Sequence, residues 1–161
     1  MIPGRLLLVF NILIITMTLQ AQRIELPQKK KLSAEAARLI LDAAEKKAKE
    51  NGWNVSIAIV DDAGRLMAFL RMDSTNNATV DVSIAKAMHA ANYGRDTKFH
   101  QDLLEKGNAV VATLPNAMPL AGGLRLLLNN QLIGAIGVSG VAAEDDEKIA
   151  NAGVAVLEQF Q

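Results

Sequence analysis

The sequence contains no cysteine, only two histidines and few aromatic residues. The absence of cysteine excludes disulfides, thiolate metal sites, a thiol nucleophile and covalently attached c-type haem. A closed zinc site with several histidine ligands is not expected from His89 and His100 alone. The 17 basic and 17 acidic residues balance, whereas nucleic-acid binding proteins normally show a basic excess. We therefore predict no nucleic-acid partner.

The sequence also lacks the short motifs that carry common catalytic chemistry. It has no P-loop, no dinucleotide-binding GxGxxG, no HExxH and no convincing Ser-His-Asp arrangement. A catalyst of this composition would depend on a bound cofactor. The sequence therefore favours a binding protein over an enzyme.

The first 21 residues have the order of a secretory signal peptide. Arg5 precedes a mostly apolar run over residues 6–17, and a short polar stretch then leads to Ala21. This run is shorter than the ~20 residues that cross a bilayer. We predict cleavage after Ala21, a linker over residues 22–32, one domain over residues 33–161 and a periplasmic or secreted location. An uncleaved N-terminal anchor is the alternative.

Hydrophobic periodicity predicts alternating helices and hairpins after the linker. Hairpins require antiparallel pairing, so we predict an α+β fold with an antiparallel β-sheet flanked by helices. The expected elements are a helix capped by Ser33 and ended by Asn51-Gly52, strands over 55–60 and 66–72, a helix from residue 80 that Gly94 breaks, a short helix over 99–106, a long loop over 109–123, strands over 124–128 and 132–139, and a final helix that begins at Glu144.

Four motifs, in this order, resemble the GlcG/HbpS family. They begin at Leu32 (LSAEAARLILDAAEKKAKENGWNVSIAIVDDAGRL), Ser83 (SIAKAMHAANYGRDT), Gly122 (GGLRLLLNNQLIGAIGVSG) and Asp145 (DDEKIANAG). The family includes an extracellular haem-binding protein and the C-terminal domain of a cobalamin adenosyltransferase. The resemblance implies a profilin-like α/β/α sandwich that assembles into homo-oligomers. It also implies haem or iron binding in some members, and links to haem degradation or glycolate metabolism in others.

His89 carries the main functional hypothesis. A family motif that resembles KA-x-T-A reads Lys86-Ala87-Met88-His89-Ala90 in this chain, so an imidazole stands where the family often has a hydroxyl. Imidazole is a strong axial ligand for haem iron. We predict that His89 binds haem iron, with Met88, Tyr93 or a partner subunit as the second ligand. A histidine that serves packing or a subunit contact is the alternative.

Two cations and two glycines near His89 could complete a ligand site. Lys86 and Arg95 could hold a carboxylate, either a haem propionate or a small organic acid. Gly122 and Gly123 match the GG element of the family and could bring backbone N–H groups close to a ligand. Alternatively, the two cations are solvated on a helix surface, and the two glycines only allow a tight entry into the following strand. We predict that the imidazole and the glycine bend face a common hollow.

Glu144 and Glu147 share a helix face at a spacing that could bind iron, although an acidic first turn explains them without metal.

The sequence as a whole predicts an exported, non-enzymatic protein that binds haem, a related tetrapyrrole or iron. One alternative is a small organic-acid binding protein or accessory enzyme of the glycolate type. Another is an oligomeric partner of a membrane sensor.

Overall fold

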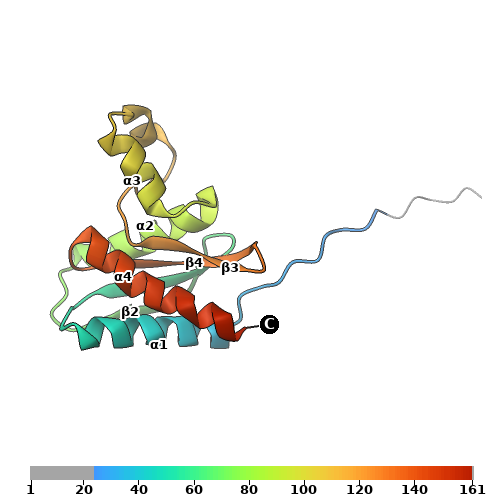
Figure 1. The fold of residues 1–161 in the computed structure, drawn as a ribbon, viewed down its shortest axis with the longest axis horizontal. Coiled ribbons are helices and arrows are strands. Elements are labelled where there is room, and N and C mark those ends of the chain that lie inside the picture. Colours follow the sequence, from blue (N-terminus) through green and yellow to red (C-terminus); the bar gives the residue numbers. More distant parts are fainter. Residues whose placement is uncertain (1–23, 161) are drawn as a thin grey trace, which may run out of the picture.

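The computed structural model describes residues 24–160, in which helices and strands follow one another in the predicted order (Figure 1). The predicted signal peptide, residues 1–21, lies outside the described residues, and residues 24–33 contain no helix or strand. Within residues 24–160, no helix is long and apolar enough to span a membrane. The elements are α1 (Ala34–Glu50), β1 (Ser56–Asp61), β2 (Leu66–Arg71), α2 (Ala78–Tyr93), α3 (Thr97–Glu105), the 3-10 helix η1 (Ala109–Thr113), β3 (Gly123–Leu128), β4 (Gln131–Ser139), α4 (Ala143–Val154) and the 3-10 helix η2 (Ala155–Gln159).

The strands of the described residues form one antiparallel sheet in the order β2-β1-β4-β3. In the turn between β1 and β2, the Asp61 carboxylate accepts hydrogen bonds from the amides of Ala63 and Arg65 at 2.9 and 2.8 Å. In the turn between β3 and β4, Asn129 and Asn130 have φ angles of 51° and 62°, which asparagine tolerates better than most residues. The predicted α+β class with an antiparallel sheet is confirmed.

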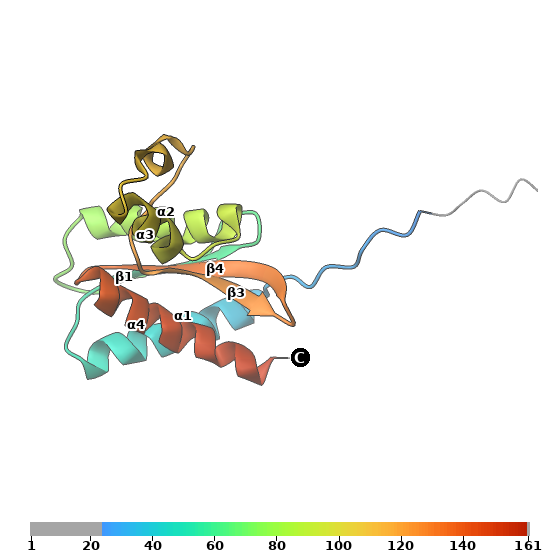
Figure 2. The ribbon, with the colours of Figure 1, turned by 45° about the horizontal axis from the view of Figure 1, so that its top comes forward.

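Helices cover both faces of the sheet, so the domain has three layers (Figure 2). α1 and α4 lie on one face, where large aliphatic side chains such as Ile40, Ile136 and Ile149 form the main core. α2 lies on the other face, against a layer of small side chains that includes Ala87 and Ala135. This arrangement is the expected α/β/α sandwich.

Glycine brings α2 into contact with the backbone of β4. A Cβ atom at Gly137 would lie only 2.1 Å from the carbonyl oxygen of Ser83 on α2. No side chain fits at that separation, so this glycine allows helix and strand to approach closely. The position of α2, which carries most of the predicted site residues, is therefore fixed by direct backbone packing.

Residues 97–121 leave the sandwich above α2 and form a projection (Figures 1 and 2). The projection consists of α3, η1 and the chain that returns to β3. The loop predicted over residues 109–123 therefore begins with the 3-10 helix η1, a short element that apolar periodicity does not reveal. Several of its large apolar side chains are exposed, namely Phe99, Leu104, Val110 and Leu120.

Candidate functional site

Lys86 is fully buried between α2 and the sheet. Its ammonium group donates to Oδ2 of Asp146 at 2.7 Å and to the carbonyl oxygen of Val138 at 2.9 Å. Asp146 lies in the first turn of α4, on the opposite face of the sheet, so the pair joins the two helical layers. Burial lowers the pKa of Lys86 and raises that of Asp146, while the opposite charge of each partner counters these shifts. The carboxylate that Lys86 holds is therefore an internal one.

Gly122 and Gly123 pack directly on this ion pair. A Cβ atom at Gly122 would lie 2.8 Å from Cβ of Asp146 and 3.0 Å from Nζ of Lys86, and one at Gly123 would lie 2.5 Å from the Lys86 carbonyl oxygen. The amide of Gly123 donates to Oγ1 of Thr97 at 2.9 Å. Gly122 and Gly123 thus allow α2, α4 and β3 to approach closely. The amide of Gly123 is already hydrogen-bonded to Thr97.

His89 lies one turn after Lys86 on α2 and has no exposed surface. Its Nδ1 accepts a hydrogen bond from the Met118 amide at 2.7 Å, and its Nε2 lies 2.8 Å from Nδ1 of His100. Burial and the neighbouring His100 lower the pKa of His89 to about 4. His89 is therefore a neutral imidazole at neutral pH, with both ring nitrogens engaged in hydrogen bonds.

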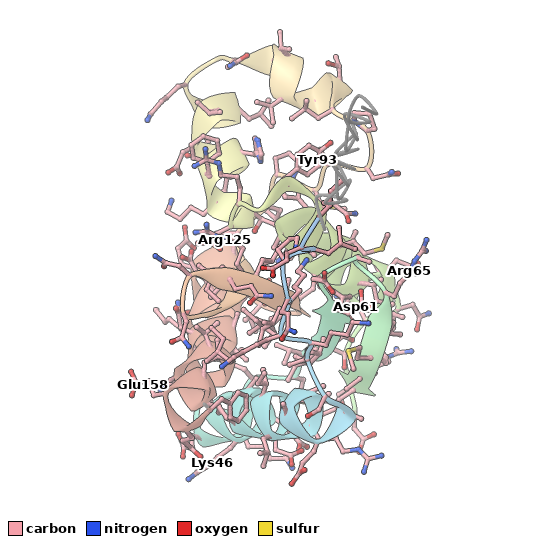
Figure 3. All side chains as sticks on the ribbon, turned by 90° about the vertical axis from the view of Figure 1, so that its right-hand side faces the viewer. Lys46, Asp61, Arg65, Tyr93, Arg125 and Glu158 are labelled. Carbon is pink, nitrogen blue, oxygen red and sulfur yellow. The ribbon has the colours of Figure 1, made fainter. Side chains whose placement is uncertain are left out.

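His89, Tyr93, Phe99 and His100 form one aromatic group, which we call the histidine cluster. The ring centroids of His89 and His100 are 4.9 Å apart, as are those of His89 and Tyr93, and Phe99 lies 5.1 Å from His100. The guanidinium carbon of Arg95 lies 4.7 Å from the centroid of the Phe99 ring. The cluster thus combines imidazoles, a phenol and a neighbouring cation. Its Tyr93 lies where the projection meets α2 (Figure 3).

The histidine cluster and the glycine bend face different neighbours. Gly122 and Gly123 contact the Lys86–Asp146 pair, whereas His89 contacts Met118 and His100. The structure therefore does not bring the predicted imidazole and glycine bend together through shared contacts. A cleft of about 620 Å³ lies elsewhere, between the start of α1 and the turn of the β3–β4 hairpin, and none of its lining residues belongs to either feature.

The remaining predicted site residues, Met88, Glu144 and Glu147, lie outside the histidine cluster. Met88 is half-buried and packs on the small-residue layer beneath α2. Glu144 is exposed and Glu147 half-buried at the start of α4. Burial raises the pKa of Glu147, an effect that the nearby Lys98 opposes. Among residues 24–160, no three His, Asp or Glu side chains are grouped to hold a metal ion.

Sequence reasoning left Phe99, His100 and Asp146 out of the site. His100 follows His89 by eleven residues, which places it near the same face of an ideal helix. Gly94 ends α2 with a φ of 57°, and the chain changes direction there. His100 therefore lies on the next helix, α3, which brings it back to His89. Asp146 sits among four consecutive acidic residues, and no local pattern distinguishes the buried one.

Comparisons with known proteins identify similar sequences and folds. A family model described as "Haem degrading protein HbpS-like" matches residues 32–155. Protein GlcG of Escherichia coli K12 is 38% identical over 108 residues, which cover 67% of this chain and 81% of that protein. The crystal structure of HbpS has a TM-score of 0.75 and 31% identity, covering 83% of this chain and 94% of HbpS. The crystal structure of a PduOC:heme complex has a TM-score of 0.73 and 25% identity, covering 78% and 94%.

Proposed function

The chain belongs to the HbpS-like family, and we propose that it binds haem at the histidine cluster without acting as an enzyme. The resemblance recognised in the four sequence motifs is confirmed by the family match. The description of the family model refers to haem, and a similar protein, PduOC, was crystallised as a heme complex. The observation in this chain that carries the proposal is a neutral imidazole pair grouped with an aromatic surface and a cation.

The chemistry of the donor set fits haem. Iron binds the unprotonated nitrogen of an imidazole, and the lowered pKa of His89 and of His100 keeps both rings neutral at pH 7. The exposed ring of Phe99 offers a flat apolar surface, and the exposed guanidinium of Arg95 can bind a propionate in bidentate fashion. The sequence prediction that His89 is the iron ligand stays a prediction, with His100 as the second imidazole of the cluster. Lys86 is not available for a propionate because Asp146 binds it.

The exposed apolar side chains of the projection support assembly into a homo-oligomer. The projection carries the exposed side chains of Phe99, Val110 and Leu120, and Val110 is 68% exposed. Several exposed large apolar side chains on one projecting segment favour an interaction site there. A second copy that covers the projection could also cover the second face of a bound haem. Export to the periplasm or the medium, predicted from residues 1–21, is part of this proposal.

A hemin titration of the mature, untagged protein tests the proposal. Because the sequence has only two histidines, the variant His89→Gln/His100→Gln removes every imidazole. We expect the wild type to give a shifted Soret band, and the double variant to lose the imidazole spectrum and roughly tenfold or more in affinity. Lys98→Gln, an exposed change on α3, is the matched control and should behave as the wild type. An unchanged spectrum and affinity in the double variant would reject the proposal.

In the organic-acid alternative, two of the expected donors of the anion site are engaged within the protein. Nζ of Lys86 is bound to Asp146, and the amide of Gly123 is bound to Thr97. Short carboxylates such as glycolate should therefore give no thermal stabilisation at millimolar concentration, since only a ligand of the folded state raises its stability. A partner role for a membrane sensor stays a prediction of the sequence.

A further inference from the structure

One short segment hydrogen-bonds two side chains of the histidine cluster. The Met118 amide donates to Nδ1 of His89 at 2.7 Å, and the Tyr93 hydroxyl donates to the Pro115 carbonyl oxygen at 2.5 Å. We call residues 115–118 the cap. Pro115 and Asn116 are exposed and Met118 is half-buried, so the cap is held by few buried contacts. Such segments open at low free energy compared with the core.

The Met118 amide determines where the protons of both imidazoles lie. A backbone N–H can only donate, so Nδ1 of His89 carries no proton. The neutral ring of His89 then carries its proton on Nε2 and donates it to Nδ1 of His100. His100 accepts this proton at Nδ1, so its neutral ring carries its own proton on Nε2. The capped state therefore leaves no free imidazole lone pair in the cluster.

Nε2 of His100 is the ring nitrogen that reaches the surface. Every buried side-chain nitrogen or oxygen of residues 24–160 has a hydrogen-bond partner. Nε2 of His100 makes no hydrogen bond among these residues, so it must contact solvent. His100 is 8% exposed, whereas His89 is 0% exposed. A ligand as large as haem can approach His100 more directly than His89.

We infer that His100, through Nε2, is the residue that binds haem iron, that His89 positions it, and that the cap must open first. This inference rests on the proposed haem binding. When Met118 leaves, Nδ1 of His89 can take a proton from water. The proton on Nε2 of His89 moves to Nδ1 of His100, and Nε2 of His100 releases its proton to water. Each ring keeps one proton, and His100 now presents a lone pair while its Nδ1–H donates to His89.

The resulting arrangement is one that metal-binding histidines commonly use. A ligating imidazole usually donates its second N–H to a buried acceptor, which fixes the ring and increases its basicity. Nε2 of His89 becomes this acceptor in the opened state. His89, which lies within the stretch that resembles the family motif, is thus assigned the positioning role, and His100, outside that stretch, is assigned the iron.

Nitrogen-15 NMR of the haem-free protein tests the capped state independently of haem binding. We expect both Nδ1 atoms to be unprotonated and both Nε2 atoms to carry protons. A proton on Nδ1 of His89 or of His100 would overturn the tautomer assignment. This result would leave the proposed haem binding untouched.

Hemin titration of single variants tests the ligand assignment. His100→Gln should abolish the imidazole signature in the spectrum, whereas His89→Gln should keep it with roughly 10- to 100-fold weaker binding, because glutamine can still accept from His100. The opposite result, in which only His89→Gln loses the signature, assigns the iron to His89 and overturns the inference. If both variants keep the wild-type spectrum and affinity, the proposed function itself fails.

Weakening the cap should favour haem. Tyr93→Phe removes the bond to Pro115, and Met118→Pro removes the amide that holds His89, so each should raise affinity by roughly three- to tenfold, the effect of one hydrogen bond. Met118→Leu keeps the amide and is the matched control. Unchanged affinity in both cap variants would exclude a cap that opposes binding. Weaker binding in Tyr93→Phe would assign Tyr93 to the iron.

Discussion

The buried ion pair between Lys86 and Asp146 gives a prediction whose size follows from the structure. The side chains are 0% and 3% exposed, and the charged groups are 2.7 Å apart. Asp146→Asn removes the negative charge and leaves the ammonium group with the Val138 carbonyl oxygen and a neutral amide. Removal of one partner from a buried pair costs about 3–5 kcal/mol, because an uncompensated charge stays in the interior. We expect a loss of this size in the free energy of unfolding at pH 7, measured by urea denaturation.

The neighbouring residue supplies the control. Asp145 lies in the same first turn of α4 and pairs with Lys148, whose side chain is 62% exposed. Asp145→Asn removes the same charge from the helix N-terminus, yet it should cost only about 1 kcal/mol or less. If Asp146→Asn costs no more than Asp145→Asn, the burial argument is wrong.

A second variant and the pH dependence separate charge from packing. Lys86→Met combined with Asp146→Asn removes both charges, so the double variant should be about 1–3 kcal/mol more stable than Asp146→Asn alone. In Asp146→Asn, the pKa of Lys86 in the folded state should fall further below its ordinary 10.5. The unfolded chain then binds more protons than the folded one, so the stability of this variant should rise between pH 7 and 10. A flat profile would contradict a buried charged lysine.

Three further predictions concern the same helix and its surroundings. His89 has a pKa of about 4 in the folded protein, against an ordinary value of 6.5. The free energy of unfolding of the haem-free protein should therefore fall by ~3 kcal/mol as the pH falls from 6.5 to 4. In thermal unfolding, the stability of His89→Gln should depend less on pH. Gly122→Ala should cost ~3 kcal/mol in urea, whereas Gly107→Ala, also at positive φ but facing open space, should cost ~1 kcal/mol. Arg95→Gln should change stability by less than ~1 kcal/mol and weaken hemin binding severalfold.

The fold was largely predictable because its signals are local. Ser33 caps α1 by accepting from the Ala36 amide at 3.1 Å, as its place before an apolar periodic segment predicts. The Asn129-Asn130 pair marks a hairpin turn through the backbone conformations that asparagine tolerates. Each of these features involves residues within four positions of one another. Strand alternation and helix periodicity then supply the layers.

The contacts of the candidate site were not predictable in the same way. Lys86 and Asp146 are 60 positions apart, and the sheet separates the helices that carry them. Composition and spacing do not distinguish Lys86, which is fully buried, from Lys98, which is exposed. The partner of His89 lies beyond the end of α2, where a helix periodicity argument stops. Residue types could be selected from the sequence, but their partners required the tertiary structure.

Three consecutive turns of α2 carry Lys86, His89 and Tyr93 on one face, and two different parts of the chain hold them. Asp146 of α4 binds Lys86 inside the sandwich, whereas His89 and Tyr93 bind the projection and its cap. Helix α2 is therefore anchored to the core at Lys86 and covered by a surface segment one and two turns later. Opening of the cap breaks the bond of His89 to Met118 and that of Tyr93 to Pro115, and neither bond involves the ion pair. The cap opening that we infer therefore requires no change in the contact between Lys86 and Asp146.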